Sequence, residues 1–302
     1  MSISVQNLTK QYGSQSAISD LSFEARKGEI IGFLGPNGAG KTTTMKILTC
    51  FIPQTAGTAS VCGFDTQKNA NQVRERVGYL PEHNPIYKDM YVKEYLTFVG
   101  DLHRIKNVKH HVAEMIERTG LTAEQNKIIG TLSKGYRQRV GLAQAMIHNP
   151  DVLILDEPTT GLDPNQLVEI RTLIRELAAE KTVILSTHIM QEVEALCHRA
   201  IIINQGQLVA NDTIEGLRRH AQTETVVTVE FLESVTKQAL AALSHATKIT
   251  QLSDKKWQIY TPSTLDIRAD LAAFASQNKL TLVGISREQS SIQDVFSSLT
   301  QN

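Results

Sequence analysis

The stretch Gly35-Pro36-Asn37-Gly38-Ala39-Gly40-Lys41-Thr42-Thr43 follows an apolar run that ends at Leu34 and precedes a second one that begins at Met45. This order predicts a buried strand, a glycine-rich loop and the start of a helix. Glycine allows a tight turn in which successive backbone N–H groups point into one concavity, and the helix start adds the positive end of its dipole. The spacing G-x-x-x-x-G-K-T is that of a P-loop, which holds the phosphates of a nucleoside triphosphate.

Two side chains of this loop have predicted roles beyond the backbone cradle. Lys41 is expected to reach the β- and γ-phosphates and so to act in catalysis as well as in binding. The hydroxyl of Thr42 is expected to complete the ligand shell of Mg²⁺, which prefers oxygen ligands and nucleotide phosphates. The whole stretch from Gly35 to Thr43 is therefore the predicted nucleotide-binding segment.

Two carboxylates, Asp156 and Glu157, follow the apolar run Val152-Leu153-Ile154-Leu155. Such a run predicts a strand buried on both faces, whose carboxyl end lies beside the P-loop. Asp156 is then placed to hold Mg²⁺, directly or through water, and Glu157 to accept the proton of the attacking water or to orient it. His188 ends the next apolar strand, where a neutral imidazole can contact the γ-phosphate, although a lone histidine in such a place is usually structural.

Composition limits the function classes. The chain has 302 residues, enough for two domains, and 31 Lys and Arg balance 31 Asp and Glu, so nucleic acid is not the expected partner. Cys50, Cys62 and Cys197 are odd in number and widely spaced, which favours a reduced, cytosolic location. The N-terminus has no signal peptide pattern, and no segment reaches the ~20 apolar residues of a membrane-spanning helix. If the protein works at a membrane, another chain is expected to supply the span.

The order of patterns predicts an α/β domain over residues 1–220. Alternating apolar residues at the start indicate antiparallel strands, and helical spacing over about 90–148 indicates a helical insert between two parts of one sheet. Strands and helices then alternate, which predicts a mostly parallel sheet covered on both faces. The expected elements after the insert are a strand over 152–155, a helix that begins at Asp163-Pro164, a strand over 182–187 and a hairpin over 199–209.

A polar run from Arg218 to Thr223 separates a second domain, residues 224–302. Its pattern predicts β-α-β-β-α-β, a small ferredoxin-like α+β domain, followed by a final amphipathic helix. Trp257 and the apolar stripe of that helix fit a dimer contact, but plain core packing is the favoured interpretation, and a regulatory module that binds a small ligand is a further alternative. The stripe consists of Ile292, Val295, Phe296 and Leu299.

Taken in order, the motifs of the first 220 residues resemble the ATP-binding subunit of an ABC transporter. The motifs that carry the resemblance, besides the P-loop, are Leu132-Ser133-Lys134-Gly135-Tyr136, Asp156-Glu157-Pro158-Thr159-Thr160, Gly161-Leu162-Asp163-Pro164 and Ser186-Thr187-His188. More narrowly, the chain resembles the drug-resistance and gliding-motility type of bacterial ATPase subunit, which also carries a short C-terminal domain.

The resemblance implies roles for residues outside the P-loop. Tyr12 would stack on the adenine, unless it is simply an exposed turn tyrosine. Ser133 and Gly135 would belong to the signature loop that closes on the γ-phosphate of ATP bound to a second subunit. Asp163 would cross the dimer interface, cap its own helix, or do both.

The sequence departs from the family pattern at three positions. Lys134 and Tyr136 replace a glycine and the glutamine of the usual Leu-Ser-Gly-Gly-Gln signature, so the contacts of those two positions are not carried over. Glu82 replaces the usual glutamine of its loop, and its carboxylate can still approach Mg²⁺ or a water of that ion. These departures are familiar in the narrower drug-resistance group.

The function that the resemblance implies is ATP hydrolysis coupled to transport, with ATP and Mg²⁺ as cofactors. Two ATPase subunits, identical or paired, would close head to tail on ATP, and hydrolysis would reopen them. The insert around Tyr91 to Leu102 would dock on a separate transmembrane permease, and export is the expected direction of transport. Docking would place the chain in the cytoplasm, at the inner face of the membrane. The alternative is a soluble ABC-type ATPase acting on nucleic acid or ribosomes, which commonly carries a coiled-coil insertion or two fused ATPase units; this chain shows one P-loop and no sustained heptads.

Overall fold

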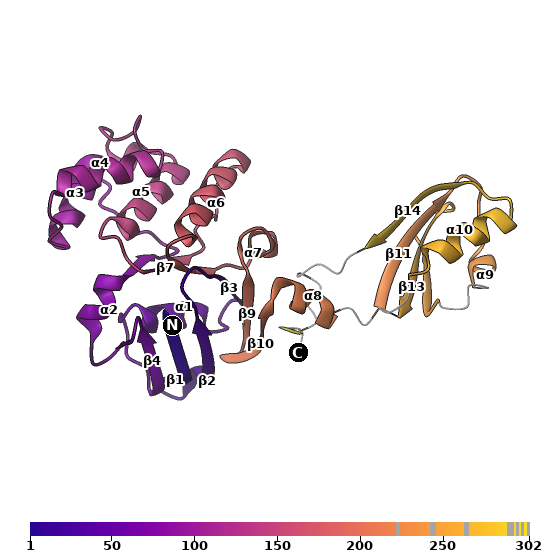
Figure 1. Cartoon of the computed structure of the whole chain (residues 1–302), viewed down its shortest axis with the longest axis horizontal. Coiled ribbons are helices and arrows are strands. Elements are labelled where there is room, and N and C mark those ends of the chain that lie inside the picture. The colour runs from indigo at the N-terminus through magenta and orange to yellow at the C-terminus, as the bar shows by residue number, and fades with distance from the viewer. Residues whose placement is uncertain are drawn as a thin grey trace. The chain divides into compact units, whose positions relative to one another are not determined.

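The computed structural model describes residues 1–221, 224–241, 246–262 and 266–288, together with Gln293, Phe296, Leu299 and Thr300. The chain divides into two compact units, Met1–Ile214 and Glu215–Asn302. This division falls before residue 220, where the sequence pattern ends the first domain, because most of helix α8 (Ile214–Ala221) belongs to the second unit. Figure 1 shows the elements of both units.

An antiparallel sheet combines the two strands that precede the P-loop strand with two that follow the P-loop helix. Its order is β2-β1-β4-β5. Alternation places Ile3 and Val5 of β1 inside, and a register irregularity between Val5 and Leu8 brings Leu8 inside as well; all three are buried. The strands are β1 (Ile3–Tyr12), β2 (Gln15–Ala25), β4 (Ala56–Val61) and β5 (Phe64–Asp65).

A six-stranded sheet of order β10-β9-β3-β8-β7-β6 forms the centre of the unit. Every pairing in it is parallel except that of β9 with β10, which confirms the predicted mostly parallel sheet. The hairpin between β9 and β10 turns at Gln205 and Gly206, which both have positive φ. The strands are β3 (Ile30–Leu34), β6 (Val77–Leu80), β7 (Val152–Asp156), β8 (Thr182–Ser186), β9 (Arg199–Asn204) and β10 (Gln207–Thr213).

Helices cover this sheet and form the predicted insert. Figure 1 shows α3, α4 and α5 gathered together, away from the antiparallel strands. Helix α5 begins after Ser133, whose side chain accepts a hydrogen bond from the backbone of Tyr136, and α6 begins after Asp163 in the same way. The helices are α1 (Lys41–Leu48), α2 (Ala70–Arg76), α3 (Val92–Leu102), α4 (Val108–Arg118), the 3₁₀ turn η1 (Ile129–Thr131), α5 (Lys134–Met146), α6 (Pro164–Ala178) and α7 (Met190–Leu196).

The second unit has the element order and the antiparallel sheet, β12-β13-β11-β14, of a ferredoxin-like fold. Val229, Phe231, Trp257 and Leu271 lie in its separate core. Half of the predicted stripe lies outside the described residues, since Ile292 and Val295 are not among them. The elements are β11 (Glu224–Phe231), α9 (Lys237–Leu240), β12 (Lys248–Gln251), β13 (Lys256–Pro262), α10 (Arg268–Gln277) and β14 (Leu282–Glu288).

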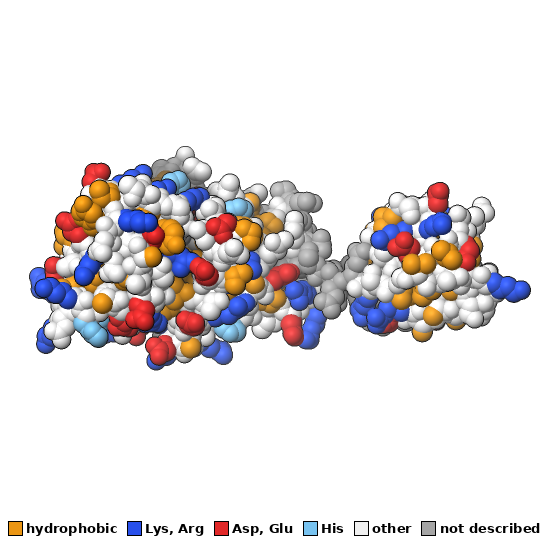
Figure 2. All heavy atoms as spheres, turned by 90° about the horizontal axis from the view of Figure 1, so that it is seen from above, with side chains coloured by type: hydrophobic (Ala, Val, Ile, Leu, Met, Phe, Trp, Pro, Cys, Tyr) orange, Lys and Arg blue, Asp and Glu red, His pale blue; other side chains and the backbone are white. Residues whose placement is uncertain are grey.

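The surface agrees with the balanced composition. On the face drawn in Figure 2, basic and acidic side chains are interspersed rather than gathered by sign. Among the described residues, no helix combines the length and the apolar character that crossing a membrane requires.

Candidate active site

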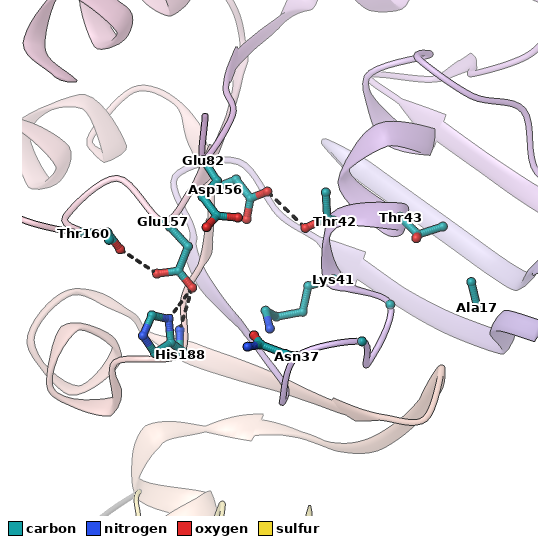
Figure 3. A pocket seen from close by; sticks show the side chains of 12 residues that line it. Ala17, Asn37, Lys41, Thr42, Thr43, Glu82, Asp156, Glu157, Thr160 and His188 are labelled. Carbon is teal, nitrogen blue, oxygen red and sulfur yellow. Dashed lines mark hydrogen bonds and ion pairs between the residues drawn. The ribbon is translucent and has the colours of Figure 1, made fainter. Parts of the chain in front are cut away.

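A cleft of about 460 Å³ opens where strands β3 and β7 end. It brings together side chains that lie far apart in the sequence (Figure 3). Ligands of α/β proteins bind at this edge of the sheet, outside the carboxyl ends of the strands. The lining residues are Ala17, Asn37, Gly38, Gly40, Lys41, Thr42, Thr43, Glu82, Asp156, Glu157, Thr160 and His188.

The glycines of the loop are required by its close packing. Gly40 has φ 102°, and a Cβ there would lie 2.6 Å from the carbonyl oxygen of Ala17 on β2. A Cβ on Gly35 would lie 2.6 Å from the carbonyl oxygen of Ile203 on β9. The loop is therefore pressed between two strands, and its shape depends on residues that have no side chain.

Lys41 is held inside the loop. Its Nζ donates to the carbonyl oxygen of Gly35 at 2.6 Å and to that of Pro36 at 3.2 Å. Burial lowers the pKa of Lys41, while the carboxylates of Glu157 and Asp156 act in the opposite direction. An ammonium group in this place can pair with the phosphates of a nucleotide without leaving the loop.

The oxygen-bearing side chains predicted to hold Mg²⁺ lie beside the loop. Thr42 Oγ1 donates to Asp156 Oδ2 at 3.3 Å, and Glu82 lines the same cleft from the loop that follows β6. Burial raises the pKa of Asp156, and the neighbouring carboxylates of Glu157 and Glu82 raise it further. A hard divalent cation binds hydroxyl and carboxylate oxygens, and its charge would offset the repulsion between the carboxylates. These residues therefore fit Mg²⁺.

Glu157 is the most constrained side chain of the cleft. Its backbone is left-handed, with φ 53°, which costs a residue with a Cβ roughly 1–2 kcal/mol. The buried carboxylate accepts hydrogen bonds at both oxygens: Oε1 from the backbone N–H of His188 at 3.1 Å, and Oε2 from Thr160 at 3.1 Å and Thr187 at 3.3 Å. His188 Nδ1 lies 2.6 Å from Oε1 (Figure 3). The strain and these contacts hold the carboxylate in one orientation at the cleft.

Within the P-loop, Gly35, Pro36 and Ala39 do not line the cleft, and three predicted site residues elsewhere in the chain do not line it either. Tyr12 is exposed at the end of β1, with Lys10 Nζ 5.1 Å from its ring centroid. Ser133 and Gly135 lie at the start of α5. Among the described residues, these positions are separate from the P-loop cleft of their own chain, and their nucleotide contacts stay predictions.

Asp163 caps its own helix, as expected. Its Oδ1 accepts hydrogen bonds from the backbone N–H groups of Asn165 and Gln166 at 3.0 and 2.9 Å. Its role at a dimer interface stays a prediction.

The structure adds residues that sequence reasoning missed. Thr160 and Thr187 hold Glu157, and Ala17 lines the cleft. The two threonines lie within the motifs already recognised, and a hydroxyl beside a candidate base is a usable signal. Ala17 lies on a distant antiparallel strand and carries no such signal, because only the sheet arrangement brings it to Gly40.

A glycine loop between a buried strand and a helix, with an acidic pair at the end of a neighbouring strand, defines a P-loop ATPase. A profile of the family described as ABC transporter matches residues 18–160. The linearmycin resistance ATP-binding protein LnrL of Bacillus subtilis (strain 168) is 30% identical over 304 residues, which cover 99% of this chain and 98% of that protein. The chain therefore belongs to the ABC transporter family, as an ATP-binding and ATP-hydrolysing subunit.

Two further comparisons agree. The bacitracin transport ATP-binding protein BcrA of Bacillus licheniformis is 38% identical over 219 residues, 72% of this chain and 71% of that protein. The dimeric ATP-binding cassette MJ0796, in a post-hydrolysis state with ADP and Pi, has the same fold, with a TM-score of 0.65 at 22% identity over 70% of this chain and 98% of that one. The resemblance inferred from the motifs is thus confirmed, and the alternative of a soluble ATPase acting on nucleic acid or ribosomes gains no support.

Proposed function

We propose that this chain is the ATPase subunit of an exporter, in which two copies close head to tail around ATP. The observation that carries this proposal is a division of the site. The P-loop, Asp156 and Glu157 share one cleft, whereas Ser133 and Gly135 lie at the start of α5 outside it. A second copy can supply the missing half, with the N–H groups and the Ser133 hydroxyl at the start of its α5 directed at the γ-phosphate.

Different residues of the cleft bind the phosphates, hold the metal ion and accept the proton. Loop N–H groups and Lys41 hold the β- and γ-phosphates. Thr42, Asp156 and Glu82 would hold Mg²⁺, which neutralises charge on the phosphates when bound. Glu157 then takes a proton from the attacking water. The water oxygen bonds to the γ-phosphorus, and the bond between that phosphorus and the bridging oxygen of ADP breaks. His188 holds Glu157 and faces the same cleft.

Exposed apolar side chains on the helical insert support docking on a separate transmembrane permease. Tyr91, Phe98 and Leu102 are 49%, 39% and 66% exposed, and the Tyr87 ring lies 5.8 Å from that of Phe98. A cluster of this kind is costly to leave in water and marks an interaction site. Docking there would hold the subunit at the inner face of the membrane.

The names of relatives support export as the direction. LnrL is a linearmycin resistance protein and BcrA a bacitracin transport protein. We infer that this subunit drives removal of a compound from the cell, while the membrane partner selects the compound.

The substitution Glu157→Gln tests the proposal. It keeps the shape of the side chain but removes the base, so MgATP should bind while turnover falls by at least about 100-fold. Size-exclusion chromatography in MgATP should then show a dimer. The double variant Glu157→Gln with Lys41→Ala is the control and should stay monomeric. Near wild-type turnover, or a monomer saturated with MgATP, would contradict the proposal.

A further inference from the structure

Helix α5 contains a glycine, Gly141, in its interior, where glycine disfavours the helix. A Cβ on Gly141 would collide with the side-chain amide of Asn84. That amide reaches the helix backbone, since Asn84 Nδ2 donates to the carbonyl oxygen of Arg137 at 3.1 Å. The missing side chain therefore leaves a notch on α5, and the amide of Asn84 is seated in it.

The contact at the notch connects the loop of Glu82 with the start of α5 at Ser133, two segments that take part in the proposed catalytic cycle. Asn84 lies two residues after Glu82, which lines the nucleotide cleft, while Asn84 itself does not line it. Arg137 lies one helical turn after Ser133, and its Nη1 donates to the carbonyl oxygen of Leu132 at 2.6 Å. One contact thus connects the loop beside the ATP of this copy with the helix start offered to the other copy.

The arrangement of Asn84 is only partly satisfied. Its Oδ1 is buried and has no hydrogen-bond partner in the described part of the chain. A buried amide oxygen without a donor costs free energy, so a shift of the loop that supplies a donor would be favoured. A loop that shifts in this way would be biased by a ligand that fills the neighbouring cleft.

We propose that Asn84, seated in the Gly141 notch, is a positioning residue that transmits the filling of the cleft at Glu82 to α5 and so to Ser133. The proposal rests on the dimer of the proposed function. Asn84 acts through α5 and touches neither ATP nor the attacking water.

Two substitutions break the contact from opposite sides. Asn84→Leu keeps the branching of the side chain at Cγ but removes the donor, and Gly141→Ala fills the notch while favouring the helix itself. Each should leave the affinity for ATP within about twofold, because neither residue lines the cleft. In the Glu157→Gln background each should weaken the ATP-dependent dimer roughly three- to tenfold, the effect of one neutral hydrogen bond, and should lower kcat to a similar extent in the otherwise wild-type chain.

The double variant and a neighbour supply the controls. Because both substitutions remove the same contact, the double variant should be no weaker than the worse single one, whereas independent effects would multiply. His83→Leu changes an exposed side chain of the same loop and should alter neither affinity nor dimerisation.

The outcomes separate this inference from the proposed function. If Glu157→Gln fails to dimerise in MgATP, the proposed function fails and the inference falls with it. If it dimerises and both notch variants dimerise equally well, the inference alone is wrong. A parallel loss of ATP affinity and kcat, or loss of folding in both single variants, would make Asn84 a general structural residue and would also overturn it.

Discussion

His188 and Glu157 are joined by two contacts to one oxygen. Glu157 Oε1 lies 2.6 Å from Nδ1 of His188 and accepts the backbone N–H of the same residue at 3.1 Å. The histidine side chain is 59% exposed, whereas the carboxylate is buried. His188 thus connects the candidate base to the open side of the cleft, where it can both hold Glu157 and meet the γ-phosphate.

His188→Ala should lower kcat by about 100-fold with little change in the affinity for ATP, because it removes the imidazole from Glu157 Oε1 without disturbing the P-loop. Steady-state kinetics and nucleotide titration measure the two quantities separately. His83→Ala, on an exposed residue, is the control. An unchanged kcat would remove His188 from the catalytic machinery.

Lys41→Ala should weaken ATP binding roughly 10- to 100-fold, the effect of losing charge-assisted hydrogen bonds to phosphate. Titration with a fluorescent ATP analogue measures this change. Lys46→Ala removes a lysine from the same helix that does not line the cleft and should bind normally. Equal affinity in the two variants would refute the P-loop assignment of Lys41.

Asp156→Asn should stabilise the nucleotide-free protein while abolishing stimulation by Mg²⁺. Burial raises the pKa of Asp156 above 3.8, so the folded state binds its proton more tightly, and ionisation at neutral pH opposes folding. Removing that charge should therefore raise the free energy of unfolding of the nucleotide-free protein. Thermal unfolding with and without MgATP measures both effects, and a less stable apo variant would contradict this reasoning.

His148 should make stability depend on pH. It stacks on His103 at 4.1 Å between ring centroids, and its Nε2 lies 3.1 Å from the carbonyl oxygen of Val77. Burial lowers the pKa of His148 from 6.5 to about 4. As the pH falls, the unfolded chain therefore protonates this histidine before the folded chain does. The free energy of unfolding is unaffected by His148 above pH 6.5, and it falls by up to about 3 kcal/mol as the pH is lowered towards about 4.

Urea unfolding at a series of pH values measures this dependence. His148→Gln, which can keep a donor to Val77 without titrating, should flatten the curve between pH 6.5 and about 4. His110→Gln, on an exposed residue, should leave the slope as it is. A slope unchanged by His148→Gln would assign the acid sensitivity to other groups.

We propose that the C-terminal unit is an accessory domain, so removing residues 224–302 should leave the ATP site folded. The cores of the two units share no described residue. Nucleotide titration of the truncated chain measures the site, and the fluorescence of Trp257, the only tryptophan, reports the second unit in the full chain. A truncated chain that cannot bind ATP would show that the boundary is wrongly placed.

Local sequence patterns were enough to predict the P-loop, the buried strand before Asp156 and the helix that begins at Asp163-Pro164. The glycines and Lys41 of the P-loop, the buried run that ends at Asp156, and the capping pair Asp163-Pro164 all depend on residues adjacent in the chain. Turn chemistry, capping and hydrophobic period act over a few residues, so they can be read without knowing the fold.

Contacts between distant segments were decided only by the tertiary structure. The parallel pairing of β7 with β8 places Asp156 opposite Ser186, and the end of β8 then supplies three of the four contacts of Glu157, from Thr187 and His188. Strand order also brings Ala17 to Gly40. No local period specifies which strands become neighbours.

The tertiary structure also decides where the P-loop cleft and the start of α5 lie within one chain. The sequence by itself determined that Ser133, Gly135 and the P-loop belong to one kind of ATPase. Only the tertiary structure placed Ser133 outside the cleft and seated Asn84 in the notch at Gly141. The positions of Ser133 and Asn84 depend on how helix α5 packs against the loop after β6. That packing is a property of the whole domain rather than of any one segment.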